Sequence, residues 1–432
     1  MSKTSIKSIV GRRVWNSHGQ PTIEVEVTLR YGASGRAIAP SGAFMATGEA
    51  VSLDVEAAIH GVYGEIAKAL KGEDAADQQH IDRVLIDLDA TADKSRLGGN
   101  AMIATSLATA QAAAADARMP LWQYLRQSGE IPAPTFLPLP EVQIFGSAAN
   151  ASGGAVDVQD YMIIPTGADS FVQALDWSAA VTHAAADLMA EAGTLRGVTD
   201  QGGLWPNFQR NEDALDLLLR AIEAAGLAPG RDMCLSLDIA ASRFGAKGKY
   251  HLHRDGQTLD SDGLSGLLVD WIERYPIVSI EDPLAEGDKE GMIRFTWAVG
   301  KRVQVVGDDS LITKATRIRA AGRDGACNAV LINPGQAGTL SETLAALTAA
   351  GKAGLSAIAS ARSGDSEDTG IVHLAAGWDI PQIKVGAIMR GERTAKWNEG
   401  LRIAEAIAAL GGEGADKDGP LPPASSFPWA KR

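Results

Sequence analysis

Cysteine is scarce in this chain, whose 432 residues include only Cys234 and Cys327. Cys234 lies in a short apolar segment, so we expect it to pack in the core and not to form a disulfide. The sequence also lacks an apolar signal segment at its N-terminus, and it has no apolar run long enough to cross a bilayer. Together these absences predict a soluble, cytoplasmic protein with no membrane partner.

Positive charge is in deficit as well. The chain has 40 Lys and Arg residues against 53 Asp and Glu residues, which gives a formal net charge of −13. Such a balance argues against nucleic acid or an anionic membrane surface as a principal partner. We find no P-loop, no zinc-type cluster of cysteine and histidine, and no serine nucleophile elbow. What the chain does have is length and a hydrophobic content of 45%, which favour a large core divided between two domains.

Acidic residues stand at the ends of three apolar, strand-like segments. They are Asp238 after Cys-Leu-Ser-Leu, Glu281 after Val-Ser-Ile, and Asp308 after Val-Gln-Val-Val-Gly. A single acid in such a place is explained equally well by a salt bridge. Three in comparable places favour a cation site, because uncompensated carboxylates that converge would repel one another. Oxygen-only ligands of this kind favour Mg²⁺ over Zn²⁺.

The alternation of strand-like and helical segments continues beyond these acids. Further strands are expected at Ala329–Asn333, Ser356–Ser360 and Gln382–Lys384, and helical stretches rich in alanine and leucine, such as Leu340–Lys352, separate them. Repeated β-α units of this length predict an α/β fold, a TIM-like (β/α) barrel in which the carboxyl ends of the strands form the active site.

The N-terminal part has a different pattern. Thr22–Leu29 alternates strictly between polar and apolar residues, which predicts a half-buried antiparallel strand. Helices are expected from about residue 49 to 70 and from about 99 to 127. An α+β domain is the interpretation that fits this mixture.

Proline marks the expected domain boundary and the expected tail. Ile131–Pro140 carries four prolines, which break regular structure and make it the best candidate linker. We therefore assign residues 1–135 to the N-terminal domain and 136–432 to the barrel domain. The tail from Gly419 to Arg432 also has four prolines and is expected to extend over the surface.

Ten short segments, spread over both predicted domains, share their residues and their order with one family. They are Gly19–Val25, Pro40–Ala43, Val156–Ile163, Asp200–Gly203, Leu237–Ser242, Ser279–Pro283, Val306–Asp309, Gly338–Thr343, Arg362–Gly364 and Gln382–Lys384. On these segments the chain resembles enolase, the magnesium-dependent phosphopyruvate hydratase, nearly from end to end. The resemblance implies an N-terminal α+β domain followed by an enolase-type (β/α)8 barrel, and association as at least a homodimer.

The resemblance also implies the binding residues. The positions that match the family's three principal metal ligands are Asp238, Glu281 and Asp308. The positions that match its substrate contacts are Gln159, Arg362, Ser363 and Lys384. These residue types suit the task, because arginine and lysine bind oxyanions and carboxylates bind Mg²⁺. We therefore expect a site that binds Mg²⁺ together with one small anionic ligand of the carboxylate/phosphate type.

The family's proton-transfer groups are replaced in this sequence. Enolase needs a base to remove a proton from carbon 2 of 2-phosphoglycerate and an acid to help hydroxide leave carbon 3. In the enolase superfamily the base acts together with Mg²⁺, which holds the charge of the enediolate. Asn333 matches the base lysine and Gln201 matches the acid glutamate, and an amide serves neither purpose near neutral pH. The neighbouring acid that assists this glutamate corresponds to Asp160, which is still a carboxylate.

Three more family positions are altered. Ala361 and the region of Ala151 stand where the family has histidines, and Phe44 stands where a serine ligates a second Mg²⁺. Lys384 is then the main remaining proton-transfer candidate, with a pKa that a metal and neighbouring cations would lower, and Asp160 is the second.

Three functions are compatible with these residues. The first is a diverged lyase-type enzyme that acts on a small phosphorylated or phosphonylated carboxylate of the 2-phosphoglycerate or phosphoenolpyruvate type. The second is a catalytically inactive homologue that binds Mg²⁺ and ligand as a regulator or scaffold. Ordinary hydratase activity is the least favoured, because losing one acid or base costs about 10²–10⁴ in rate and several are replaced here.

Overall fold

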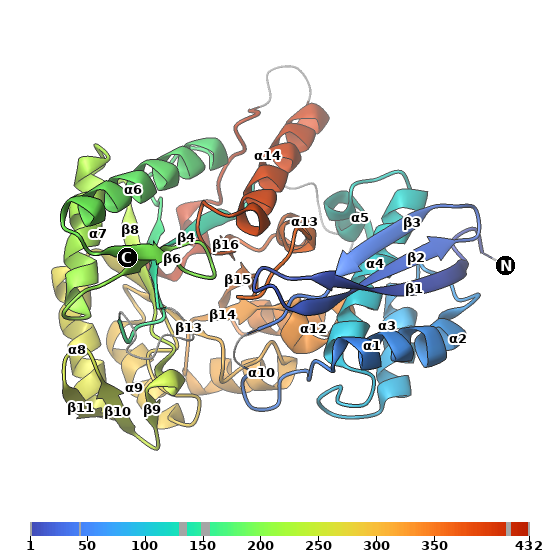
Figure 1. The fold of residues 1–432 in the computed structure, drawn as a ribbon, viewed down its shortest axis with the longest axis horizontal. Helices are drawn as coiled ribbons and strands as arrows, with labels where there is room; N and C mark the ends of the chain where they lie inside the picture. Colours follow the sequence, from blue (N-terminus) through green and yellow to red (C-terminus); the bar gives the residue numbers. More distant parts are fainter. Residues whose placement is uncertain (1, 43–44, 129–135, 148–155, 412–415, 431–432) are drawn as a thin grey trace.

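The N-terminal part forms a three-stranded sheet covered by helices. The computed structural model describes residues 2–42, 45–128, 136–147, 156–411 and 416–430. The strands are antiparallel in the order β1 (Ile6–Trp15), β2 (Pro21–Leu29) and β3 (Ser34–Ile38). The alternating segment is confirmed as a strand, and its apolar side chains from Ile23 to Leu29 are fully buried beneath α4 (Gly99–Asp116). Figure 1 shows this sheet and its helices beside the barrel.

Both predicted N-terminal helices are divided. The helix expected from residue 49 begins at Val55, because the Asp54 side chain caps it by accepting a hydrogen bond from the Glu56 backbone N–H at 2.9 Å. The helix expected from 99 to 127 is interrupted by Arg118, which has a left-handed φ of 56°, and by Pro120. The helices of this domain are α1 (Val55–Gly61), the π-helical η1 (Val62–Ile66), α2 (Ala67–Leu70), α3 (Gln78–Asp89), α4 (Gly99–Asp116) and α5 (Leu121–Ser128).

The second part is a closed barrel of eight strands. In ring order they are β4 (Leu139–Gly146), β5 (Asp160–Ile164), β8 (Cys234–Asp238), β12 (Ile277–Glu281), β13 (Gln304–Gly307), β14 (Ala329–Ile332), β15 (Ser356–Ser360) and β16 (Gln382–Lys384). Pairing of Lys384 with Glu141 and of Gln382 with Leu139 closes the ring. The predicted α/β barrel is therefore confirmed, and β8, β15 and β16 have the predicted bounds.

One strand departs from the repeated β-α pattern. β5 runs antiparallel to both of its neighbours, β4 and β8, whereas the other seven strands run parallel to one another. Because it is reversed, β5 places its first residue, Asp160, at the rim formed by the carboxyl ends of the parallel strands. Asp160 is the direct register partner of Asp238. The reversal thus brings the start of one strand into the candidate site.

Helices surround the barrel, and short additional strands lie in the connections between its elements (Figure 1). The helices are α6 (Phe171–Glu191), α7 (Glu212–Ala224), α8 (Ser261–Arg274), α9 (Lys289–Val299), α10 (Ala315–Asp324), α11 (Pro334–Ala337), α12 (Leu340–Lys352), α13 (Gly370–Gly377) and α14 (Gly391–Gly411). The additional strands are β6 (Leu195–Val198), β7 (Leu204–Pro206), β9 (Gly245–Ala246), β10 (Lys249–Leu252) and β11 (Gln257–Asp260). In the described ranges, no helix combines the length and apolar character that a membrane span requires. The predicted domain boundary at residue 135 lies in the stretch 129–135, outside the described residues.

The C-terminal tail closes the bottom of the barrel. Phe427 is only 3% exposed and packs in a cluster with Leu139, Ile164, Cys234 and Val278, which lie at the end of the barrel opposite the strand-end acids. Its ring stacks on that of Trp429, with centroids 4.5 Å apart. Phe427 thus covers apolar side chains at the base of the barrel. The expectation of a tail extended over the surface is therefore wrong for this segment. Cys234 is buried and forms no disulfide, as predicted, and the same holds for Cys327.

Truncating Phe427 should destabilise the barrel. The Phe427→Ala change leaves a cavity among buried apolar side chains, so we expect the free energy of unfolding to fall by about 3–5 kcal/mol. Urea unfolding followed by circular dichroism measures it. Trp297 is 86% exposed, and Trp297→Ala, the matched aromatic control, should change stability by no more than about 0.5 kcal/mol. Equal effects of the two changes would contradict a sealing role for Phe427.

Candidate active site in the mouth of the barrel

A cavity of about 500 Å³ lies at the carboxyl ends of the barrel strands. The ten residues that the sequence predicts for the site all line it: Gln159, Asp160, Gln201, Asp238, Glu281, Asp308, Asn333, Arg362, Ser363 and Lys384. Ala361 also lines it. Phe44 and Ala151, which the sequence analysis singled out, lie outside the described residues. Residues dispersed over more than 220 positions of the sequence thus meet in a single hollow.

The three predicted metal ligands stand on adjacent strands. Asp238 ends β8 and Glu281 ends β12, and the two are register partners. Asp308 follows β13, the next strand of the ring. Asp238 and Glu281 are each 2% exposed. Burial, reinforced by the charge of Asp238, raises the pKa of Glu281 well above its ordinary value, and burial also raises the pKa of Asp308.

Lys384 lies between two of these acids. Its Nζ is 2.8 Å from Oδ2 of Asp238 and 2.7 Å from Oε2 of Glu281. Burial acts to lower the pKa of Lys384, but the charges of Asp238 and Glu281 outweigh it, so the pKa lies well above its ordinary value. The expectation of a pKa lowered toward neutrality is therefore wrong for this structure. The side chain is a fixed ammonium that partly neutralises the acids.

Two further acids in the cavity were missed by sequence reasoning, although each directly follows a predicted ligand. Asp282 has a left-handed φ of 41° and accepts hydrogen bonds from the backbone N–H groups of Asp308 and Asp309, at 3.0 and 2.9 Å. Ligand oxygens of Asp282, Asp308 and Asp309 lie within 4.8 Å of one another. Burial and the neighbouring charge of Asp308 raise the pKa of Asp309 to about 8. The signal was present in the Glu-Asp and Asp-Asp pairs themselves.

The charge balance of the cavity suits a divalent cation. Among the described residues, seven carboxylates and three cationic side chains line it. The carboxylates are Asp160, Asp200, Asp238, Glu281, Asp282, Asp308 and Asp309, and the cations are Arg243, Arg362 and Lys384. Excess negative charge in a buried hollow is unfavourable unless it is protonated or neutralised by a cation. Because all these donors are oxygens, the residues fit Mg²⁺.

Gln159 and Asp160 line the side of the cavity nearest β8. Gln159 donates a hydrogen bond from Nε2 to Oδ2 of Asp238 at 2.8 Å, and its Oε1 accepts one from Arg243 at 3.0 Å. Gln143 donates a hydrogen bond to Oδ1 of the buried Asp160. Burial, with the nearby charge of Asp238, raises the pKa of Asp160 to about 7. This carboxyl group can therefore gain and lose a proton near neutral pH.

The two amides that the resemblance places at the family's base and acid positions have different surroundings. Asn333 is 2% exposed, and its Oδ1 caps α11 by accepting a hydrogen bond from the Gly335 N–H at 2.9 Å. The sequence signal for this cap was Asn followed by Pro, a common pair at a helix start. Gln201 lies in the turn between β6 and β7. Gln143 Oε1 supports that turn by accepting a hydrogen bond from Gly203 N–H at 2.9 Å.

A histidine of the N-terminal domain reaches the rim of the cavity. Nε2 of His18, in the turn between β1 and β2, is 3.0 Å from Oδ2 of Asp200. The sequence analysis did not predict this contact, because the two residues belong to different domains and no local pattern links them. The rim of the site is therefore built by both domains.

The predicted phosphate-binding pair is also held from both domains. Arg362 Nη2 is 2.6 Å from Oε1 of the buried Glu49. Gly42 packs against the guanidinium so closely that an added Cβ would lie 2.0 Å from Nη2. A side chain at this position would therefore displace the guanidinium from its present place. Burial raises the pKa of Glu49, against the opposing charge of Arg362.

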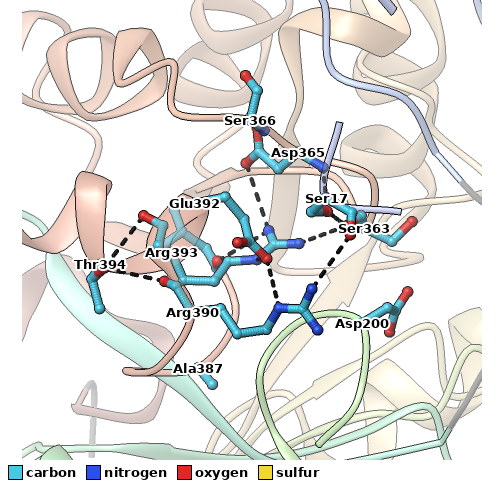
Figure 2. A network of polar contacts seen from close by, with 12 residues as sticks. Ser17, Asp200, Ser363, Asp365, Ser366, Ala387, Arg390, Glu392, Arg393 and Thr394 are labelled. Carbon is cyan, nitrogen blue, oxygen red and sulfur yellow. Dashed lines mark hydrogen bonds and ion pairs between the residues drawn. The ribbon is translucent and has the colours of Figure 1, made fainter. Parts of the chain in front are cut away.

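Beneath this pair, a network of polar contacts fixes the backbone (Figure 2). Arg393 donates hydrogen bonds to the carbonyl oxygens of Arg362 and Ser363, at 2.9 and 2.5 Å. Arg390 donates to the carbonyl oxygen of Ser17 at 3.3 Å, so the same helix end also holds the β1–β2 turn. The segment that presents Arg362 and Ser363 is thus positioned by α14.

Comparison with protein families accounts for this arrangement. The family model described as "Enolase, N-terminal domain" matches residues 6–125, and the model described as "Enolase, C-terminal TIM barrel domain" matches residues 134–417. Together the two models cover most of the chain and follow the order of its two structural parts. The chain therefore belongs to the enolase family.

Proposed function

We propose that this protein is a Mg²⁺-dependent enzyme of lyase type that binds a small phosphorylated or phosphonylated carboxylate and moves protons differently from enolase. The observation that supports it best is the mouth cavity, where an intact acidic set, Lys384 and the Arg362–Ser363 pair meet around amides instead of a base and an acid. The family resemblance further supports a homodimer, and the scarcity of cysteine supports a cytoplasmic location.

Binding of the ligand follows from the charges. Asp238, Glu281 and Asp308 would hold Mg²⁺, which when bound supplies positive charge to the carboxylate end of the ligand. Lys384, whose Nζ lies 2.8 Å from Asp238 and 2.7 Å from Glu281, would add positive charge at the same place. Arg362 offers a planar set of N–H donors to the phosphoryl or phosphonyl oxygens, and Ser363 lies beside it. Ligand oxygens that bind Arg362 replace the Glu49 carboxylate as its partner.

Asp160 is the residue that we assign to proton transfer. Its pKa of about 7 lets both protonation states exist at working pH, which is the requirement for an acid or base catalyst. Lys384 is less suited, because its pKa is raised. Asn333 caps α11, and the amides of Asn333 and Gln201 exchange no proton near neutral pH.

The alternative of a non-catalytic binding protein is favoured by one observation. Asn333, at the position of the family's base, has become the cap of α11 and contributes to structure. The charged groups of the cavity would then serve Mg²⁺ and ligand binding alone. Turnover assays separate this alternative from the enzyme.

The purified protein should not dehydrate 2-phosphoglycerate at an enolase-like rate. With Mg²⁺ present, we expect turnover to be lower by at least about 10²–10⁴, because the base and the acid are replaced. The appearance of phosphoenolpyruvate, followed by ultraviolet absorbance, measures the rate. The double variant Asn333→Lys with Gln201→Glu is the matched control and should gain activity. Brisk turnover by the unaltered protein would overturn our account of the replaced groups.

A screen of phosphonates and phospho-acids identifies the ligand class. Its first readout is thermal stabilisation of the protein, and its second is conversion of the compound. For any compound that is converted, Asp160→Asn should lower kcat by about 10²–10⁴ and abolish the pH dependence of the rate near neutrality. Lys384→Met should mainly raise KM. A variant Asp160→Asn with an unchanged pH profile would refute the role of Asp160, and stabilisation without any conversion would favour the non-catalytic protein.

Stability without metal should fall as the pH rises. The native pKa values of Asp160 (about 7) and Asp309 (about 8) lie above the ordinary value of 3.8, so the native state binds protons that the unfolded chain has already lost. The free energy of unfolding therefore decreases from about pH 4 to about pH 8, and Mg²⁺ should reduce the decrease. Melting temperatures in chelator and in Mg²⁺ measure both effects. Asp309→Asn should make the free energy of unfolding depend less on pH, whereas Asp262→Asn, at an exposed acid, should not change this dependence. A metal-free protein that gains stability over this interval would contradict the prediction.

A further inference from the structure

Arg243 is a third cationic side chain of the cavity, and the binding scheme above leaves it without a role. It belongs to the 3-10 turn η2 (Ala241–Arg243), which follows β8 directly. The turn is anchored on the next strand connection, since Ala241 N–H donates to the Asp282 carbonyl at 3.2 Å and Glu286 N–H donates to Ser242 Oγ at 2.9 Å. Arg243 is therefore presented at the mouth by a fixed piece of backbone.

The partners of Arg243 are neutral. Its Nη1 donates hydrogen bonds to Ser147 Oγ at 3.2 Å and to Gln159 Oε1 at 3.0 Å. The other two cations of the cavity are paired with carboxylates, Arg362 with Glu49 and Lys384 with two acids. Within the described part of the chain, no carboxylate forms an ion pair with Arg243, although seven line the same cavity. An arginine in such surroundings keeps most of its charge available to an incoming anion.

The position of Arg243 in the ring adds a second argument. β8, which precedes Arg243, and β15, which precedes Arg362, are four strands apart in either direction around the barrel. The two arginines therefore follow strands on opposite sides of the ring, and the contacts of Arg243 place its guanidinium beside Ser147, which follows β4, and Gln159, which precedes β5. The acids and Lys384 lie between the two arginines, on β8, β12, β13 and β16. A ligand held by Arg362 at one end and by Mg²⁺ and Lys384 in the middle would extend toward Arg243 at its other end.

We propose that Arg243 binds an additional anionic group of the ligand, so that the ligand class is a phosphorylated or phosphonylated acid with a second carboxylate. The inference rests on the proposed function, in which Arg362 and Ser363 hold the phosphoryl or phosphonyl group. Arg243 matches such a carboxylate, because a guanidinium forms two parallel charge-assisted hydrogen bonds with it. Arg243 therefore sets specificity, because ligands with a negative charge at both ends bind more tightly than ligands with a negative charge at one end.

Two matched probes test the proposal by titration calorimetry with saturating Mg²⁺. 2-Phosphonosuccinate and 2-phosphonobutanoate share a phosphonate and one carboxylate, and they differ in that the first ends in a second carboxylate and the other in a methyl group. We expect the unaltered protein to bind 2-phosphonosuccinate about ten- to a hundredfold more tightly, the effect of a hydrogen-bonded charge. Arg243→Gln should remove this difference and leave the affinity for 2-phosphonobutanoate within about twofold.

Variants of arginine separate charge from structure. Arg243→Lys should retain part of the preference, because it keeps the charge but loses the paired donors. Arg294→Gln, at an exposed arginine of α9 paired with Asp262, is the matched control and should bind both probes as the unaltered protein does. Equal weakening of both probes by Arg243→Gln would show that the residue acts only by holding Gln159 and Ser147, and the proposal would be wrong.

Two outcomes concern the unaltered protein. If it binds both probes but with equal affinity, the second carboxylate has no partner and the role of Arg243 is refuted, while the proposed function stands. If it binds neither probe in Mg²⁺, the phosphonate and carboxylate site itself is refuted, and this inference falls with it.

Discussion

The mouth of this barrel is dominated by repulsion among buried carboxylates. Adjacent strands bring Asp238, Glu281 and Asp308 to one rim, and Asp282 and Asp309 add to the same charge. Lys384 neutralises only part of it. Burial first, and then the charges of the neighbouring acids, raise the pKa values of Glu281, Asp282 and Asp309. In the proposed function, a divalent cation would relieve the repulsion and at the same time create a place for an anionic ligand.

The reversed strand β5 is what makes the site asymmetric. In an all-parallel ring, every strand would contribute its carboxyl end to the mouth. Here β5 contributes Asp160 from its amino end, next to Asp238. Asp160 is buried, accepts a hydrogen bond from Gln143 and has a pKa of about 7. In the proposed function, this carboxyl group transfers a proton while its neighbours hold the cation.

The sequence was sufficient for the parts of the structure that depend on local pattern. Apolar runs that end in acids located β8 and β12, and the family resemblance gathered the ten residues that line the cavity. Contacts between distant segments could not be foreseen: Glu49 against Arg362 and His18 against Asp200 join residues of different domains, and no periodicity marks them. The pKa of Lys384 was misjudged because the nearest charges in space are acids, whereas sequence reasoning counted the metal and other cations. The direction of β5 depends on which strands it pairs with, and that is a property of the closed ring.

The seal formed by Phe427 has a consequence for how the chain reaches this structure. Phe427 is synthesised after all eight strands, yet it covers apolar side chains at the base of β4, β5, β8 and β12. A nascent barrel therefore keeps an uncovered apolar surface at its base until Phe427 has been synthesised. Chains that stall or are cleaved before this residue would expose the surface to one another, which favours aggregation.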